Sequence, residues 1–255
     1  MIYDLRGTGE SAQSGDRSNR GIRMSDWIIE DVPAATRALK GRFLDAKHAA
    51  VGHSVGAHGM LVSQHEEPVK AMVMVASHAG VTKTVRTAVE RAKVWAIFNV
   101  VTPVCARLMG YVPVDKLGVG KTIPLGVMLQ WRRWASQGQY FFEDPEFDLA
   151  ERFAKAEGPV LSVVMNDDLW VHRGAVDILT DRLDRADVVK RDIEERGDRE
   201  RARRAHGLLP LEAQGSVAGS GRVAGAKSVV GRGFSSLEAQ SCSSRDNLVV
   251  VRGAR

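Results

Sequence analysis

The sequence is poor in cysteine: Cys105 and Cys242 are the only two among 255 residues. They lie far apart and fit no metal-ligand spacing, so they indicate neither a disulfide framework nor a metal site. No apolar run approaches the roughly 18 residues that cross a bilayer, and no charged leader or cleavage site follows Met1. We therefore expect free thiols in a reducing, cytoplasmic compartment, no membrane span and no bound metal.

Charge of one sign is not in large excess either. Lysine and arginine number 36 against 31 aspartate and glutamate, and the net charge of +5 is not gathered into one basic block. Binding to nucleic acid depends on such a concentration of positive charge. We therefore expect no nucleic-acid partner, and the sequence does not indicate an oligomeric state.

Short apolar runs alternate with segments of helical periodicity along much of the chain. Ala49–Gly52, Val69–Ala76 and Pro159–Met165 are predicted strands, while Ser25–Lys40 and Val55–Ser63 are predicted helices. Strands separated by helices in this way are typical of a parallel sheet that is buried on both faces. The predicted fold class is therefore α/β, a mostly parallel sheet with helices on both faces.

Two segments interrupt this alternation. Residues 81–145 are rich in aromatic residues and mostly helical, which predicts a cap insertion whose aromatics form its own core or, alternatively, face a substrate or a partner. Residues 193–255 are first densely charged and then rich in Gly, Ser and Ala, which predicts an irregular tail. The two parts of the sheet would then come from residues 1–80 and 146–192.

The strongest chemical signal is the segment Gly52-His53-Ser54-Val55-Gly56, a G-x-S-x-G pattern between a predicted strand and a predicted helix. In such an elbow the serine occupies a strained turn, and small neighbours are needed because a Cβ would clash with nearby backbone. The pattern predicts Ser54 as a nucleophile, with the backbone N–H of Val55 as an oxyanion donor. The alternative is that Ser54 only caps the helix.

A second segment, Tyr3 to Ser11, contains D-x-R-G-x-G-x-S upstream of this elbow. Together the two segments resemble the α/β-hydrolase superfamily, in which the first is a structural turn. The aromatic stretches Gln130–Trp134 and Tyr140–Asp144 resemble a bacterial branch of predicted α/β-hydrolases. The resemblance covers roughly residues 1–192, and it implies a serine hydrolase that needs no cofactor and no metal.

The resemblance also implies an acid and a base, in the chain order serine, acid, histidine. Asp168 follows the predicted strand Pro159–Met165 and matches the acid best, with Asp167 as the alternative. His206 is the remaining candidate for the base, because His172 lies too close to Asp168 in sequence. His53 belongs to the elbow itself and is expected to point away from the site.

The resemblance to the superfamily is incomplete at both ends of the chain. The chain begins inside a strand, so a loop that would supply the second oxyanion donor is expected ahead of Asp4. The branch carries Gly-His-x-Gly-Phe-Phe-Arg in its last loop, where this chain has Arg204–Pro210. Permitted codons for that stretch, read from the second base, translate as Gly-His-Thr-Gly-Phe-Phe-Arg. We therefore hypothesise an N-terminal truncation and a frameshift between about Lys190 and Arg204.

The sequence thus predicts a hydrolase that cleaves an ester, thioester or amide of a small acyl compound through an acyl-enzyme on Ser54. The alternative is an inactive α/β-hydrolase-like fragment, or a partner-binding remnant that retains the scaffold without a working triad. A labelled fluorophosphonate distinguishes them, because only an activated serine reacts.

Overall fold

A computed structural model describes residues 1–116, 120–165, 168–193 and 247–251, with side chains for all but the last of these ranges. The described residues belong to one compact unit, Met1–Glu195 together with Asn247–Arg255. The second unit, Arg196–Asp246, lies outside the described residues, and so do Asp167 and His206.

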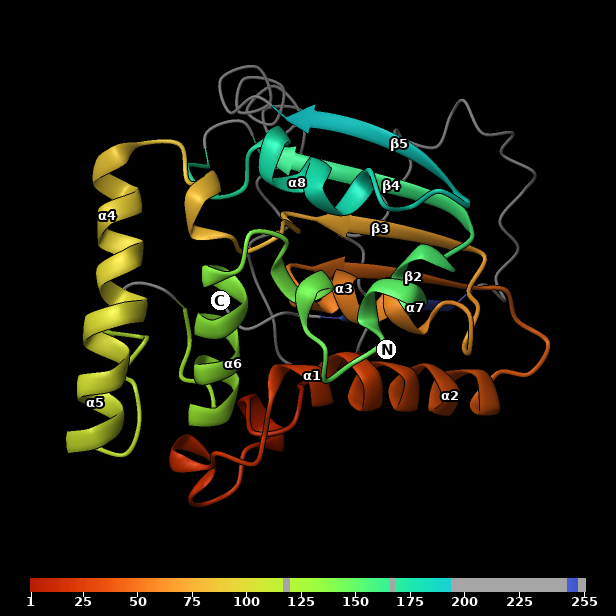
Figure 1. Ribbon diagram of the computed structural model, residues 1–255. Helices are drawn as coiled ribbons and strands as arrows, with labels where there is room; N and C mark the ends of the chain where they lie inside the picture. Colours follow the sequence, from red (N-terminus) through yellow and green to blue (C-terminus); the bar gives the residue numbers. More distant parts are fainter. Residues whose placement is uncertain (117–119, 166–167, 194–246, 252–255) are drawn as a thin grey trace, which may run out of the picture. The chain divides into compact units, whose positions relative to one another are not determined.

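The core is a parallel sheet with the strand order β1-β6-β2-β3-β4-β5 (Figure 1). The strands are β1 (Ile2–Tyr3), β2 (His48–His53), β3 (Ala71–Val75), β4 (Gly158–Met165), β5 (Ala186–Ile193) and β6 (Asn247–Val251). The predicted α/β class and the parallel sheet are confirmed. Because the strands are parallel, their carboxyl ends meet at one edge, and this edge carries the site described below.

Strand β6 was not part of the prediction, which placed its residues in an irregular tail. It pairs with β1 on one side, Tyr3 opposite Val251, and with β2 on the other, Val51 opposite Val250. Its sequence, Asn-Leu-Val-Val-Val, is β-branched and apolar and therefore suits a buried strand. The Gly- and Ser-rich composition on its N-terminal side concealed this short run.

One face of the sheet is closely covered by helices. Ala50, Met72 and Val160 point to this face and are at most 3 % exposed. Helix α3 (Val55–Ser63) packs on β2 and β3, and α8 (Arg173–Thr180) packs on β4. Side chains on the opposite face of these strands are partly exposed. The prediction placed helices on both faces of the sheet. The described residues confirm it for this face.

A long helix precedes β2 and packs against α3. It runs through α1 (Met24–Asp26), a π-helical turn (Trp27–Asp31) and α2 (Val32–Arg42). Its apolar residues, Trp27, Ile28 and Val32, are at most 1 % exposed. A Cβ on Gly59 of α3 would lie 2.5 Å from a methyl carbon of Val32, so the glycine permits the close approach of the two helices.

The cap forms most of the region between β3 and β4. Its elements are α4 (Ala88–Ala96), a π-helical turn (Ile97–Val101), α5 (Thr102–Leu108), α6 (Leu125–Ser136) and the 3-10 turn Tyr140–Glu143, and α7 (Leu149–Ala154) follows it. Trp134, Tyr140 and Phe141 are almost fully buried and contact one another, so these aromatics form a core. Figure 1 shows α4 and α5 farthest from the sheet, with α6 between them and the core.

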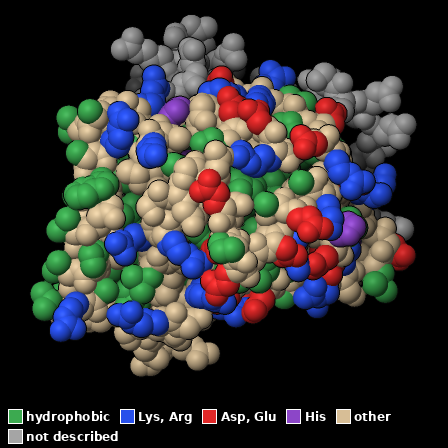
Figure 2. Space-filling view, in the orientation of Figure 1, with side chains coloured by type: hydrophobic (Ala, Val, Ile, Leu, Met, Phe, Trp, Pro, Cys, Tyr) green, Lys and Arg blue, Asp and Glu red, His purple; other side chains and the backbone are tan. Residues whose placement is uncertain are grey.

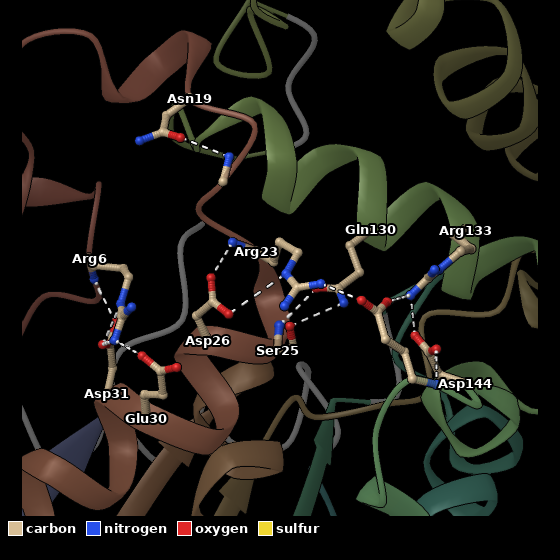
Figure 3. A network of polar contacts seen from close by, with 12 residues as sticks. Arg6, Asn19, Arg23, Ser25, Asp26, Glu30, Asp31, Gln130, Arg133 and Asp144 are labelled. Carbon is tan, nitrogen blue, oxygen red and sulfur yellow. Dashed lines mark hydrogen bonds and ion pairs between the residues drawn. The ribbon is translucent and has the colours of Figure 1, made fainter.

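Buried and half-buried polar contacts join the N-terminal segment to the cap (Figure 3). The side-chain oxygen of Gln130 on α6 accepts from the backbone N–H of Ser25 at 2.8 Å, and its amide nitrogen donates to the Ser25 hydroxyl at 3.2 Å. The backbone N–H and the Nε of Arg6 both donate to Asp31, at 2.9 and 2.7 Å. Arg6 of the D-x-R-G segment is thus held against the helix that follows it.

Among the helices of the described ranges, none combines the length and the apolar character that crossing a bilayer requires.

Candidate active site

Ser54 lies in a strained turn between the end of β2 and the start of α3. Its φ of 51° and ψ of −124° belong to a region that glycine adopts readily and other residues rarely do. The turn is held by its backbone: Ser54 N–H donates to Val75 O at 3.1 Å, and Ala57 N–H donates to Ser54 O at 3.0 Å.

The glycine at the end of β2 is required by the same turn. A Cβ on Gly52 would lie 2.4 Å from the backbone nitrogen of Ala57, which is closer than real Cβ contacts. Gly56 is buried in the first turn of α3. A strained serine between a parallel strand and a helix, at the carboxyl edge of the sheet, has the geometry of the elbow that the α/β-hydrolase fold places there. The chain has an α/β-hydrolase fold.

Ser54 and Val55 both line a pocket between this elbow and the cap. Val55 is the first residue of α3, where backbone N–H groups have no partner within the helix, so it can donate to a developing oxyanion. Most of the other pocket residues are apolar or aromatic: Met24, Trp27, Val114, Ile123, Trp131 and Tyr140.

Backbone strain is concentrated around this pocket. In the described part of the chain, the non-glycine residues with positive φ are Ser54, Ala76 and Tyr140. Ser54 and Tyr140 line the pocket, and Ala76 begins the segment that leads to the pocket residue His78. Such strain persists only where the surrounding structure enforces it, and it gathers at functional sites.

Asp168 lies in the loop that follows β4, as the sequence predicts. Its Oδ1 accepts hydrogen bonds from the backbone N–H groups of Trp170 at 2.7 Å and Val171 at 2.9 Å. These two donors hold the carboxylate in place. Asp167, the alternative acid, lies outside the described residues.

His78 is the histidine that the sequence reasoning did not assign to the site. It follows the carboxyl end of β3 by three residues and lines the pocket with Ser54. Its Nδ1 lies 3.1 Å from Ala79 O; because a carbonyl can only accept, Nδ1 carries the proton and Nε2 is left as a proton acceptor. Its position after a strand at the same sheet edge as Ser54 is the signal that could have identified it.

The environment of His78 favours its neutral form. Burial is the largest effect and lowers its pKa to about 4, while the charge of Asp168 acts in the opposite direction and raises the pKa. At neutral pH the imidazole is therefore uncharged and can accept a proton. Asp168 is the charged group that would stabilise the imidazolium once it forms.

His58, one turn after Ser54 on α3, is a weaker candidate. Its side chain packs edge-on against Tyr140 and Phe141, and both of its ring nitrogens are out of reach of solvent and lack a hydrogen bond of good geometry. Burial lowers its pKa to about 3. His53 stands at the end of β2, outside the described pocket lining, and His206 lies outside the described residues.

Comparison with known proteins gives only distant similarities. No protein-family model matches the chain, and no curated protein does. The chain is similar to the solved structure of Est816, an N-acyl homoserine lactone degrading enzyme, with 17 % identity over 81 % of each chain and a TM-score of 0.45. It is also similar to E-2-(acetamidomethylene)succinate hydrolase, with 17 % identity over 80 % of this chain and 78 % of the other, and a TM-score of 0.43.

A third similar structure is an α/β fold family hydrolase from Bacillus anthracis, at 13 % identity over 80 % of this chain and 78 % of the other, with a TM-score of 0.43. The α/β-hydrolase fold of this chain follows from its own parallel sheet and from the strained turn at Ser54.

Proposed function

We propose that this chain is a serine hydrolase that cleaves an ester, thioester or amide of a small acyl compound through an acyl-enzyme on Ser54. The observation that carries the proposal is the strained conformation of Ser54, which lies at the N-terminus of α3 and lines a pocket. A serine that only capped a helix would need no such conformation, because cap residues adopt ordinary extended dihedral angles.

We infer that His78, rather than His206, is the general base. Hydrogen bonds hold the residue on each side of it: the hydroxyl of Ser77 donates to Ser54 O at 3.0 Å, and Ala79 N–H donates to Ala175 O of α8 at 3.1 Å. His78 lines the same pocket as Ser54. Asp168, the acid that the resemblance implied as the orienting partner of the base, would stabilise the protonated ring through its charge.

The reaction then has two halves. In the first, Ser54 Oγ attacks the acyl carbon, its proton passes to Nε2 of His78, and the backbone N–H of Val55 stabilises the oxyanion. The bond to the leaving group breaks as His78 returns the proton to that group. In the second half, water gives its proton to His78 and attacks the acyl carbon, and the ester bond to Ser54 breaks as the serine is reprotonated. No cofactor or metal takes part in these steps.

The first test is covalent labelling with a fluorophosphonate. Wild-type protein is expected to be labelled on Ser54, and the Ser54→Ala variant is expected to show no label above background, because the reagent reacts only with an activated serine. Mass spectrometry of the labelled peptide identifies the residue. Ser136→Ala, at an exposed serine of α6, is the matched control and should label like the wild type. Unlabelled wild-type protein would favour the inactive scaffold instead.

The second test separates the two candidate bases. His78→Gln is expected to slow labelling of Ser54 by about 10²- to 10⁴-fold, the usual contribution of a general base, while His206→Gln should leave the rate unchanged. In the wild type, the rate should be high above pH 5 and fall as the pH decreases through about 4, because protonated His78 cannot accept the serine proton.

The pH profile is measured on the wild type and so does not depend on whether the His78 variant folds. A midpoint near 6.5, the ordinary histidine value, would contradict the assignment. The assignment would also be contradicted if His206→Gln lost labelling while His78→Gln retained it. His206 would then be the base.

A further inference from the structure

The outer surface of the cap has an unusual number of exposed apolar side chains. Val89 and Leu108 are 81 % and 78 % exposed, and Trp95, Val100 and Val104 are between 48 % and 55 % exposed. Single exposed apolar residues are common on soluble proteins, but a group of them on one element indicates a surface that contacts something else. We call this group the cap stripe.

The stripe belongs to one continuous helical stretch, made of α4, the π-helical turn Ile97–Val101 and α5. Val100, Val104 and Leu108 are four residues apart and so share a helix face. The opposite face is already buried in the protein, where Val94, Ile97, Phe98 and Ala106 are at most 8 % exposed. A helix that packs on one side of a domain usually carries polar residues on the other, whereas the exposed side of this one also carries the apolar side chains of the stripe.

Basic side chains outnumber acidic ones in the segment that carries the stripe. Residues 82–116 contain six Lys and Arg but only two acidic residues, Glu90 and Asp115. The six basic residues are all exposed: Lys83, Arg86, Arg91, Lys93, Arg107 and Lys116. In Figure 2 hydrophobic and basic side chains lie side by side over the part of the surface where Figure 1 shows α4 and α5, while acidic side chains gather over the other half.

We propose that the cap stripe and its basic surroundings dock on an anionic lipid surface. A helix with exposed apolar side chains and flanking Lys and Arg inserts the former at the boundary of the acyl chains, and the latter bind the headgroups. The charge argues against a second copy of this chain as the occupant, because two such surfaces face to face would bring like charges together. The inference goes beyond the proposed hydrolysis, and docking does not require the chemistry of Ser54.

The test is co-sedimentation of the full chain with lipid vesicles. We expect the protein to bind vesicles of phosphatidylcholine mixed with phosphatidylglycerol, to bind phosphatidylcholine alone at least tenfold more weakly, and to be released by salt. The double variant V104D/L108D should lower the partition coefficient at least tenfold, because each aspartate would have to enter the interface. The double variant R91E/R107E should lower it similarly.

Two controls complete the experiment. Leu44→Asp changes a leucine that is 83 % exposed outside the cap and should bind vesicles like the wild type. Ser54→Ala should also bind unchanged, so failure of the labelling test and failure of this inference remain distinguishable. Wild-type binding by V104D/L108D, equal binding to neutral vesicles, or a dimer in light scattering that this variant dissociates would each overturn the proposal.

Discussion

Replacement of Ser54 by glycine is expected to abolish hydrolysis and fluorophosphonate labelling while leaving a protein more stable than the Ser54→Ala variant. Both variants remove the hydroxyl of the proposed nucleophile, but only glycine relieves the strain at φ 51° and ψ −124°. A residue held in such a region costs on the order of 1–3 kcal/mol, whereas glycine costs about 0.5–1 kcal/mol in backbone entropy. The glycine variant should therefore have a free energy of unfolding higher by about 1 kcal/mol.

The comparison is made by urea unfolding of the two variants. At an ordinary helical position the order is reversed, because alanine stabilises a helix by about 0.5–1 kcal/mol relative to glycine. Ser136, an exposed residue of α6, offers this contrast: Ser136→Ala should be more stable than Ser136→Gly. If alanine were the more stable replacement at Ser54 as well, the elbow would not be strained, and the main support for the nucleophile would be lost.

A second large effect is expected at Gly52, two residues before Ser54. In Gly52→Ala the new methyl group would lie 2.4 Å from Ala57 N and 2.5 Å from Ala57 Cα, and these backbone atoms belong to the first turn of α3. Either the strand or the helix must shift. We expect the free energy of unfolding to fall by roughly 3 kcal/mol, the upper range for an overpacked core, and labelling of Ser54 to fall with it.

Gly41, near the end of α2, is the matched control for this substitution. A Cβ there meets nothing within 4 Å, and the residue is exposed. Gly41→Ala should raise the free energy of unfolding by about 0.5 kcal/mol, since alanine is the better helix former. Urea unfolding of the two variants beside the wild type measures both effects. An equal, small change in both would show that α3 does not pack on Gly52 as closely as the structure indicates.

The two substitutions test opposite properties of the same turn. Ser54 occupies a conformation that suits glycine, and it is held there by the packing of α3 against the glycine at position 52. Stability and activity are therefore expected to separate at Ser54, whereas at Gly52 they should be lost together. Such a separation is typical of active sites, where a strained residue is retained for its chemistry.

Local patterns in the sequence were enough to predict the framework of the site. The elbow is a short strand, a turn and a helix in direct succession, so its periodicity and its small residues can be recognised without knowledge of the rest of the chain. The predicted helix Val55–Ser63 agrees with α3 at both ends, and the strand before Asp168 ends at Met165 as predicted. These elements depend on neighbours within about ten residues.

Features that depend on distant parts of the chain had to come from the tertiary structure. Strand β6 could not be placed by pattern alone, because its partners, β1 and β2, lie near the other end of the chain. His78 was one of several lone histidines in the sequence, and only the meeting of parallel strands at one edge brings it beside Ser54 and under the influence of Asp168. The sequence determined the strand, turn and helix that hold Ser54; long-range strand pairing decided which groups surround it.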